Sequence, residues 1–228
     1  VIPMKWIGLI GGTTPESTEY YYRKYIEISR ELFEPYFFPE LVVFSMNFKT
    51  FKDNPRGWEG RKEMLIEAAK ALERAGAEVI GIAANTPHIV FPDVQEAVNA
   101  EMVSIIDAVA EEARRRGLKK LLLLGTKTTM EMPFYREALE KKGFQVVVPD
   151  EEERERVNSI IFNELALGKL ESKPYLVELI EKYAREGVEG VILGCTELPL
   201  AIKPGDVGIE VLDSAEIHMR ALIEKAME

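Results

Sequence analysis

An internal repeat is the feature of this sequence that most restricts its fold. Residues 74–87 match residues 185–198 at a constant offset of 111 positions. Two weaker echoes pair Gly12-Thr13 with Gly125-Thr126 and Ile106-Asp107 with Leu212-Asp213. Because the three echoes occur in the same order along the chain, they indicate two copies of one structural unit.

Short apolar runs alternate with longer amphipathic segments along the whole chain. This alternation is typical of βαβ units and predicts the α/β class with parallel sheets. Strands are expected at residues 6–10, 41–45, 79–83, 103–106, 120–124, 145–148, 188–193 and 208–212. Helices are expected at residues 20–32, 61–75, 106–116, 133–142, 151–167, 173–186 and 214–227.

The repeat and the alternation together predict two pseudosymmetric α/β domains, each with a small parallel sheet flanked by helices. We place the first domain at residues 4–104, joined by a C-terminal segment at 209–228, and the second at residues 105–208. Ligands of open parallel sheets bind beyond the carboxyl ends of the strands. We therefore expect a cleft between the two domains to collect the loops found there.

Charge and hydropathy limit the partners that we expect. The chain has 29 Lys and Arg against 39 Asp and Glu, a net charge of −10 that disfavours nucleic acid and anionic membranes. No apolar run reaches the roughly 18 residues of a membrane span, and no signal-peptide pattern is visible at the start. The one cysteine cannot form an internal disulfide. We predict a cytoplasmic protein that binds neither nucleic acid nor membranes.

Two hydroxyl-rich turns follow equivalent predicted strands. The glycines that end at Gly12 do not have the spacing of a dinucleotide fingerprint, so a nicotinamide site is not expected. Gly12 lets a ligand approach the backbone, and Thr13 offers a hydroxyl at a helix start that suits a carboxylate. In the second copy Thr126 and Thr129 could cap a helix or hold a small anion.

Cys195 and the two histidines are the candidate titratable groups. Most free cysteines are packing residues, but Cys195 follows an apolar strand beside a glycine and near a helix start, which favours the thiolate. His88 is a candidate proton carrier or hydrogen-bonding residue of its loop. His218 is expected to be structural or to lie at the rim of the cleft. Their spacing does not match a metal site, and none is predicted.

At these residues the chain resembles the aspartate/glutamate racemase family over essentially residues 4–228. The resemblance implies two α/β domains around the substrate, no pyridoxal phosphate or metal, and two cysteines that remove and return an α-proton. The matching elements are residues 7–12 with Glu16-Ser17-Thr18, the Asn85-Thr86 loop, Leu124-Gly125-Thr126 with Tyr135, and residues 194–197.

The resemblance also implies residue roles. It makes Cys195 one proton carrier, and the position of the family's first cysteine is taken by Ala84, which carries no proton. His88 is the nearest titratable replacement, and Lys52 with Arg56 could bind a distal carboxylate. The expected binders of the α-carboxylate are Asn85, Thr86, Thr126, Thr129 and Thr196.

Three functions remain open on the sequence. The first is a cofactor-independent racemase or epimerase of aspartate, glutamate or a related acid. The second is a decarboxylase in which one cysteine delivers a proton to one face of the substrate, and the third is a non-catalytic homologue that binds an amino acid or dicarboxylate. Family members commonly form homodimers, and the aromatic run at residues 36–38 is a candidate contact.

Overall fold

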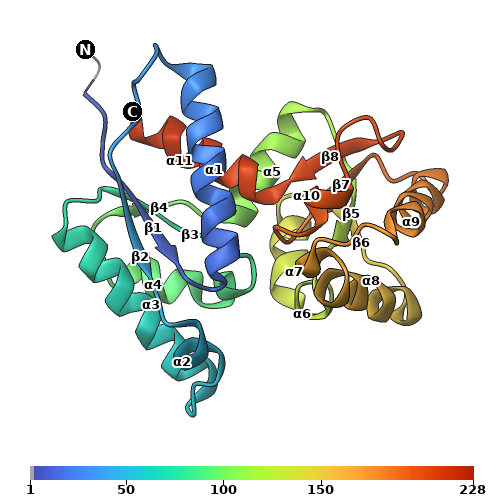
Figure 1. Ribbon diagram of the computed structural model, residues 1–228, viewed down its shortest axis with the longest axis horizontal. Coiled ribbons are helices and arrows are strands. Elements are labelled where there is room, and N and C mark those ends of the chain that lie inside the picture. Colours follow the sequence, from blue (N-terminus) through green and yellow to red (C-terminus); the bar gives the residue numbers. More distant parts are fainter. Residues whose placement is uncertain (1–2) are drawn as a thin grey trace. The chain divides into compact units, whose positions relative to one another are not determined.

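The computed structural model describes residues 3–228 and divides them into two compact α/β units (Figure 1). The first unit runs to Ile105 and takes in Ala215–Glu228, and the second comprises Ile106–Ser214. The chain therefore passes from one unit to the other twice. Within residues 3–228, no helix has both the length and the apolar character that crossing a bilayer requires.

The first unit is built on a four-stranded parallel sheet with the order β2-β1-β3-β4. Its strands are β1 (Ile7–Gly11), β2 (Leu41–Ser45), β3 (Val79–Ile82) and β4 (Glu101–Met102). Its helices are α1 (Pro15–Leu32), α2 (Phe48–Lys52), α3 (Gly57–Arg74), η1 (Thr86–Val90), α4 (Phe91–Glu96) and α11 (Ser214–Ala226).

Two hydrophobic clusters cover the two faces of this sheet. On one face, Tyr21 and Ile28 of α1 and Leu222 of α11 pack with Leu9. On the other face α3 and α4 pack against residues such as Ile82. All strand residues of β1 and β3 are buried, as expected for a parallel sheet covered on both sides.

The second unit has the same topology, with a parallel sheet in the order β6-β5-β7-β8. The prediction of two α/β domains with small parallel sheets is confirmed. Its strands are β5 (Lys120–Leu124), β6 (Gln145–Val147), β7 (Gly190–Leu193) and β8 (Glu210–Asp213). Its helices are α5 (Ile105–Arg115), α6 (Lys127–Glu131), α7 (Pro133–Lys141), α8 (Glu151–Asn163), η2 (Leu165–Leu167), α9 (Lys173–Arg185) and α10 (Leu198–Ala201).

Local sequence explains where the principal helices begin. Thr14 caps α1 by accepting a hydrogen bond from the backbone N–H of Ser17, and Pro15 fits the first turn. Asp150 and Glu153 form a reciprocal capping box at the start of α8. These caps fix the strand-to-helix turns after β1 and β6, at the carboxyl ends of the two sheets.

The structure corrects two sequence predictions. The segment at residues 210–213 is a strand that pairs with β7, so it belongs to the second unit and not to the first domain as predicted. The strand predicted at residues 103–106 is also wrong, because β4 ends at Met102 and α5 begins at Ile105. A short apolar run has the same pattern in a buried strand and in the buried first turn of a helix.

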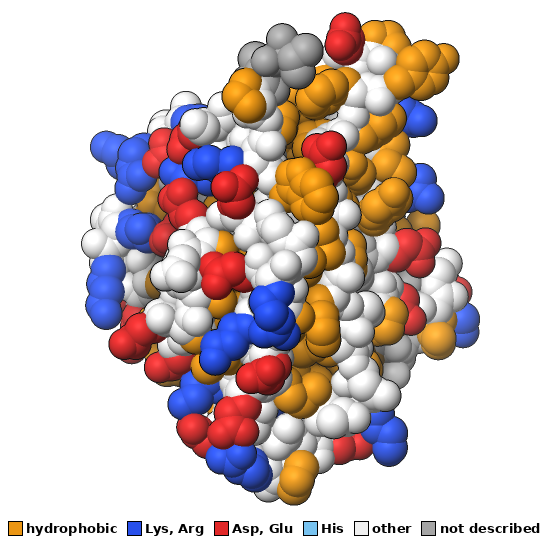
Figure 2. All heavy atoms as spheres, turned by 90° about the vertical axis from the view of Figure 1, so that its left-hand side faces the viewer, with side chains coloured by type: hydrophobic (Ala, Val, Ile, Leu, Met, Phe, Trp, Pro, Cys, Tyr) orange, Lys and Arg blue, Asp and Glu red, His pale blue; other side chains and the backbone are white. Residues whose placement is uncertain are grey.

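The outer edge of the first sheet carries an exposed apolar surface. β2 has only β1 as a neighbour in the sheet, and its last three residues are exposed. Figure 2 shows hydrophobic side chains gathered in a band on this face of the first unit. We call the set the β2-edge surface; its exposed members are Tyr22, Leu32, Tyr36, Phe38, Val43, Phe44 and Phe48.

Candidate functional site

Cys195 lies at the carboxyl end of the second sheet, two residues beyond β7. The preceding Gly194 donates its backbone N–H to the carbonyl of Leu124 at 2.7 Å, which joins the ends of β5 and β7. A Cβ on Gly194 would lie 2.7 Å from that carbonyl oxygen, closer than real Cβ atoms come. A glycine is therefore needed for the chain to present Cys195 at this edge.

The equivalent position in the first unit is Ala84. Ala83 donates its backbone N–H to Ile10 at 2.9 Å, and this bond between the ends of β1 and β3 repeats the bond made by Gly194 in the second unit. The two sheets have equivalent strand orders. Ala84 directly follows Ala83, and Cys195 directly follows Gly194, so the two residues occupy equivalent positions. Ala84 is half-buried and contributes only a methyl group.

The environment of Cys195 favours the neutral thiol. Burial raises the pKa of the thiol well above its ordinary value, and the carboxylate of Glu197 raises it further. The backbone N–H of Leu198 donates to the sulfur at 3.4 Å and opposes this effect without overcoming it. The prediction that the loop favours the thiolate is not supported, because burial and the negative charge of Glu197 outweigh the hydrogen bonds from the backbone N–H groups of Leu198 and Glu197.

The threonine-rich turn after β5 packs directly against the loop of Cys195. Thr129 is 1% exposed, and its methyl group lies where a Cβ on Gly125 or Gly194 would be crowded. The hydroxyls of Thr126 and Thr129 are 3.4 Å apart. The second unit therefore brings Thr126, Thr129 and Cys195 to one edge of the sheet, and half-buried Thr196 follows in sequence.

The glycine turn after β1 has the corresponding place in the first unit. Gly12 has a φ of 92° and donates its N–H to the hydroxyl of Thr18 at 2.8 Å. A Cβ on Gly12 would collide with the backbone of Met46. The hydroxyl of Thr13 is buried and has no hydrogen-bond partner within residues 3–228. A buried donor of this kind is suited to a ligand atom.

Asn85 and Thr86 begin the loop after β3. Asn85 is 8% exposed, and Thr86 opens the 3₁₀ helix η1. The hydroxyl of Ser17 donates to the carbonyl of Ala83 at 2.9 Å and so fixes α1 to the start of this loop. The first unit thus gathers Gly12, Thr13, Asn85 and Thr86 at the carboxyl ends of its central strands.

His88 is committed to the backbone through both ring nitrogens. Nδ1 donates to the carbonyl of Ala84 at 2.8 Å and lies 3.2 Å from that of Asn85, and Nε2 accepts from the N–H of Ile105 at 3.0 Å. The side chain is 4% exposed, and burial lowers its pKa to about 3. The prediction that His88 carries a proton does not fit this arrangement, because neither nitrogen is available to a substrate.

His218 is also part of the interior. Its Nε2 donates to the carbonyl of Val103 at 2.7 Å, and its Nδ1 accepts from the hydroxyl of Tyr21 at 2.6 Å. It is fully buried, and burial lowers its pKa to about 4. The structural role expected from the sequence agrees with these contacts.

The two basic candidates differ in their surroundings. Lys52 is the exposed last residue of α2, and no hydrogen bond or ion pair of its ammonium group occurs within the described part of the chain. The neighbouring carbonyls of Phe51 and Lys52 accept hydrogen bonds from Arg61. Arg56 pairs with Glu63 at 2.6 Å, so its charge is already matched. Lys52 is the more available cation of the two.

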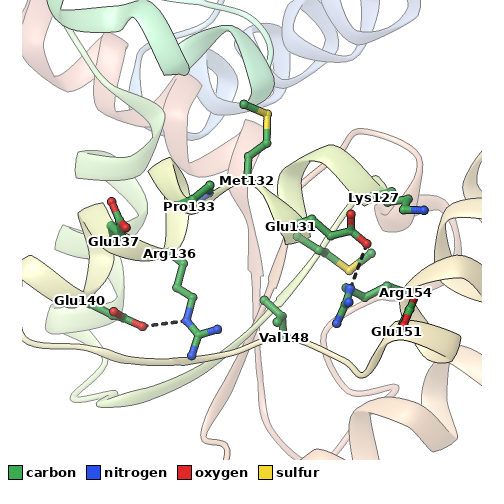
Figure 3. A pocket seen from close by; sticks show the side chains of 11 residues that line it. Lys127, Glu131, Met132, Pro133, Arg136, Glu137, Glu140, Val148, Glu151 and Arg154 are labelled. Atoms are coloured by element: carbon green, nitrogen blue, oxygen red, sulfur yellow. Dashed lines mark hydrogen bonds and ion pairs between the residues drawn. The ribbon is translucent and has the colours of Figure 1, made fainter.

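A charged pocket of the second unit was not predicted from the sequence. It has a volume of about 710 Å³ and opens beside Lys127, which follows Thr126 in the threonine turn. Figure 3 shows Arg136 directed to Glu140 and Arg154 directed to Glu131. The wall comes from α6, α7 and the start of α8, so no single sequence segment could indicate it. Each of its three cations is paired with a glutamate: Lys127 with Glu155, Arg136 with Glu140 and Arg154 with Glu131.

Metal ligands do not gather in the part of the chain that the structure describes. Groups of three or more His, Cys, Asp or Glu that could hold an ion are not found among residues 3–228. The candidate binding residues at the carboxyl ends of the two sheets offer hydroxyls, the amide of Asn85 and the thiol of Cys195. Such groups can hold a carboxylate by hydrogen bonds and exchange a proton with a carbon next to it.

Comparison with known proteins finds relatives that match nearly the whole length of the chain. A crystal structure of an aspartate racemase homologue from Pyrococcus horikoshii OT3 is 70% identical, with a TM-score of 0.95, and the match covers 99% of this chain and 100% of that one. The broad specificity amino-acid racemase RacX of Bacillus subtilis (strain 168) is 24% identical over 212 residues, which is 92% of each chain.

A more distant structure shares the fold alone. A variant of arylmalonate decarboxylase is 15% identical, with a TM-score of 0.58, and the match covers 96% of this chain and 92% of that one. The sequence pattern of one family, described as Asp/Glu/Hydantoin racemase, matches residues 10–222. With its duplicated sheets, and its match to this pattern over nearly its whole length, the chain belongs to the Asp/Glu/Hydantoin racemase family.

Proposed function

We propose that the protein is a cofactor-independent amino-acid racemase that removes and returns an α-proton with Cys195 as its only thiol. The observation that carries the proposal is the position of this cysteine, the one cysteine of the chain, at the carboxyl end of a parallel sheet. A turn that contains Thr126 and Thr129 packs against its loop. Membership of the Asp/Glu/Hydantoin racemase family supports this reaction class.

In the proposed reaction, hydroxyl and amide groups hold the α-carboxylate while the sulfur of Cys195 takes the α-proton. The C–H bond breaks, an S–H bond forms, and the electron pair left on carbon is delocalised into the carboxylate. Hydrogen bonds strengthen as this charge develops. The proposed donors are Gly12, Thr13, Asn85, Thr86, Thr126, Thr129 and Thr196.

Inversion of the stereocentre requires a proton from the other face of the carbanion. Ala84 has no proton to give, and both nitrogens of His88 are occupied by the backbone. We therefore propose that water supplies the second proton, and that the hydroxide left behind takes the proton of the Cys195 thiol through solvent, which regenerates the thiolate. Since the pKa of Cys195 is raised, only a small fraction of the protein carries the required thiolate at neutral pH. The proposed racemisation is slow at pH 7 and becomes faster as the pH rises.

The proposed substrates are acidic amino acids and related compounds. The exposed ammonium of Lys52 has no partner among the described residues and could bind a distal carboxylate. The relative from Bacillus subtilis is described as a racemase of broad specificity. This description supports a substrate range wider than aspartate and glutamate.

The test is incubation of the protein with each common amino acid in heavy water, with NMR detection of α-proton loss and chiral analysis of the same samples. Exchange with inversion, abolished by Cys195→Ala, is the expected result. Exchange with retained configuration would mean that Cys195 works on one face only. No exchange with any amino acid would overturn the proposal and favour a homologue that binds an amino acid or dicarboxylate without catalysis.

One observation favours a second candidate, decarboxylation of a disubstituted malonate. A thiol that is held neutral is suited to donate a proton, and the symmetry-related position offers no second thiol. In this reaction the C–C bond to one carboxylate breaks and carbon dioxide leaves. The carbanion takes the proton of Cys195, and solvent then reprotonates the thiolate. Release of carbon dioxide from an arylmalonate, lost in Cys195→Ser, tests this candidate.

The proposal extends to the oligomeric state and the cellular location of the protein. We expect a cytoplasmic homodimer, and the β2-edge surface supports the dimer because it exposes large apolar side chains over one edge of the first sheet. Apolar patches of this extent are typical of protein interfaces.

A further inference from the structure

Two imidazoles hold the short connection at residues 103–105, where the chain leaves the first unit. Nε2 of His88 accepts from the N–H of Ile105 at 3.0 Å. Nε2 of His218 donates to the carbonyl of Val103 at 2.7 Å. The backbone groups on both sides of Ser104 are therefore fixed by side chains that come from elsewhere in the unit. The first unit ends immediately afterwards, at Ile105.

The other side of the His88 ring reaches the loop that begins after β3. Its Nδ1 donates to the carbonyl of Ala84 at 2.8 Å and lies 3.2 Å from the carbonyl of Asn85. Because carbonyl oxygens only accept and the N–H of Ile105 only donates, His88 must carry its proton on Nδ1. One ring thus connects the loop at residues 84–86 to the connection at residues 103–105.

His218 shows the opposite tautomer by the same reasoning. The carbonyl of Val103 requires a proton on Nε2, so Nδ1 accepts from the hydroxyl of Tyr21. His218 belongs to α11, which lies in the segment that returns from the second unit. The connection is therefore held by two different ring nitrogens: Nε2 of His218 donates to Val103, and Nε2 of His88 accepts from Ile105.

Tight packing keeps both rings in place. Their centroids are 5.7 Å apart, and the ring of Phe91 stacks on His88 with an interplanar angle of 9°. Gly81 of β3 makes room for α11, since a Cβ there would lie 3.2 Å from Cε1 of His218 and 2.8 Å from Leu222. His88 is 4% exposed and His218 is fully buried. Such packing limits each ring to one orientation.

We propose that His88 is a positioning residue that ties the loop carrying Asn85 and Thr86 to the connection at residues 103–105. The part of the inference that concerns substrate rests on the proposed function, in which Asn85 and Thr86 bind the α-carboxylate. The tie itself rests on the three hydrogen bonds of the ring. In this arrangement a displacement of the connection is transmitted to the loop, because one rigid ring bonds to both.

Two substitutions separate the ends of the tie. His88→Asn places an amide N–H near the position of Nδ1, so it retains the bond to Ala84 and loses the acceptor for Ile105. His88→Gln places an amide oxygen near the position of Nε2, so it retains the bond from Ile105 and loses the donor to Ala84. Tyr21→Phe is the matched control, because it removes the hydrogen bond to Nδ1 of His218 and keeps the bond of His218 to Val103 and all three bonds of His88.

The first readout is backbone amide exchange with solvent, measured by NMR on the whole chain. We expect His88→Asn to speed exchange of the Ile105 amide about tenfold. If the ring is a tie, exchange of the amides of Asn85 and Thr86 also becomes several-fold faster in this variant, although the bond to Ala84 remains. If these two amides exchange in His88→Asn at the rate found in the wild-type protein, the proposal is overturned. Tyr21→Phe should leave them unchanged.

The second readout is the ring nitrogen NMR spectrum of the wild-type protein. It tests the hydrogen bonds of both histidine rings even if a variant fails to fold. The chain has two histidines, so the spectrum contains two imidazoles. We expect one neutral ring protonated on Nδ1 and one on Nε2, with His88→Gln removing the first. Two rings of the same tautomer would contradict the hydrogen bonds on which the tie depends.

The third readout applies if the proposed activity is found. We expect His88→Asn to raise the KM for the amino acid about tenfold and to change kcat by less than about threefold, because the loop binds the carboxylate while Cys195 moves the proton. A loss confined to kcat would overturn the positioning role. If no activity exists, the proposed function fails, but amide exchange and ring tautomers still test the tie separately.

Discussion

The sulfur of Cys195 accepts a 3.4 Å hydrogen bond from the backbone N–H of Leu198, yet its thiol remains neutral because burial and the carboxylate of Glu197 act against the charged form. This balance predicts low reactivity. Alkylation by iodoacetamide requires the thiolate, so its rate at pH 7 should fall below that of a free thiol and increase steeply with pH. The single cysteine makes the measurement unambiguous.

Glu197→Gln separates the two causes of this low reactivity. Removal of the negative charge lowers the pKa of Cys195, and we expect alkylation at pH 7 to accelerate roughly tenfold. Glu210→Gln, at an exposed position on β8, is the control and should leave the alkylation rate of Cys195 unchanged. An alkylation rate that is independent of Glu197 would show that burial alone keeps the thiol neutral.

Ala84→Cys should restore a thiol at the position equivalent to Cys195. A racemase with two thiols can take a proton with one and return a proton with the other. We expect inversion of an accepted amino acid to become at least about tenfold faster than in the wild-type protein. Ala84→Ser, which adds a side chain of similar size with no comparable acid, is the control. Equal rates for the two variants would count against the proposed reaction.

The buried histidines predict a loss of stability in mild acid. Their pKa values are lowered from 6.5 to about 3 for His88 and about 4 for His218, with burial as the main cause. The folded protein keeps both rings neutral, while the unfolded chain binds protons below about pH 6.5. Their contribution to stability is therefore complete above pH 6.5 and is lost as the pH falls.

Urea denaturation at several pH values measures this effect. Between pH 6 and pH 5 we expect the free energy of unfolding to fall by about 2 kcal/mol, since each fully neutral ring contributes up to about 1.4 kcal/mol per pH unit. His218→Gln should be less stable at pH 7.5 but should show about half this slope. An unchanged slope would mean that His218 is already protonated, or accessible to protons, in the folded state.

Gly194→Ala should destabilise the second unit. Its Cβ would lie 2.7 Å from the carbonyl oxygen of Leu124 and 3.2 Å from the methyl group of Thr129. We expect the free energy of unfolding to fall by about 1–3 kcal/mol, which is typical of an overpacked site. Gly208→Ala is the matched control, because its nearest neighbour, Glu181, lies at an ordinary 3.6 Å. Equal effects of the two substitutions would contradict the close approach of β5 and β7.

The β2-edge surface predicts the oligomeric state. Tyr36 is 96% exposed and Tyr22 is 50% exposed, and exposed large apolar side chains gathered in one patch are typical of an interface. We expect a dimer in sedimentation experiments and a monomer for Phe44→Lys, because a lysine on an edge strand opposes pairing. Phe162→Lys, at a 56% exposed position on the second unit, should remain dimeric. A monomeric wild-type protein would contradict this use of the surface.

The repeat in the sequence was sufficient to predict the fold class and the duplication. The match of residues 74–87 to residues 185–198 predicted that Ala84 and Cys195 would be equivalent, and the backbone bonds of Ala83 and Gly194 agree with this. Such patterns are local, since strand periodicity and a glycine before a turn are set by residues that are near each other in the chain. The sequence pattern did not predict short elements such as α2 and α10, because they have too few residues to show a helical period.

The properties of the side chains depended on contacts between distant residues. The sequence suggested a thiolate for Cys195, but burial among folded elements reversed the preference. It also left His88 as a proton carrier or a loop residue, and only the fold showed that Ile105, 17 residues away, occupies its second nitrogen.

The sequence by itself thus determined two α/β units and the residues at the carboxyl ends of their strands. The tertiary structure decided which of those residues are charged, which are occupied and which are accessible. The physical reason is that hydrogen-bonding periodicity is encoded along the chain, whereas the pKa of Cys195 and the tautomer of His88 are set by burial and by neighbours that only folding brings together.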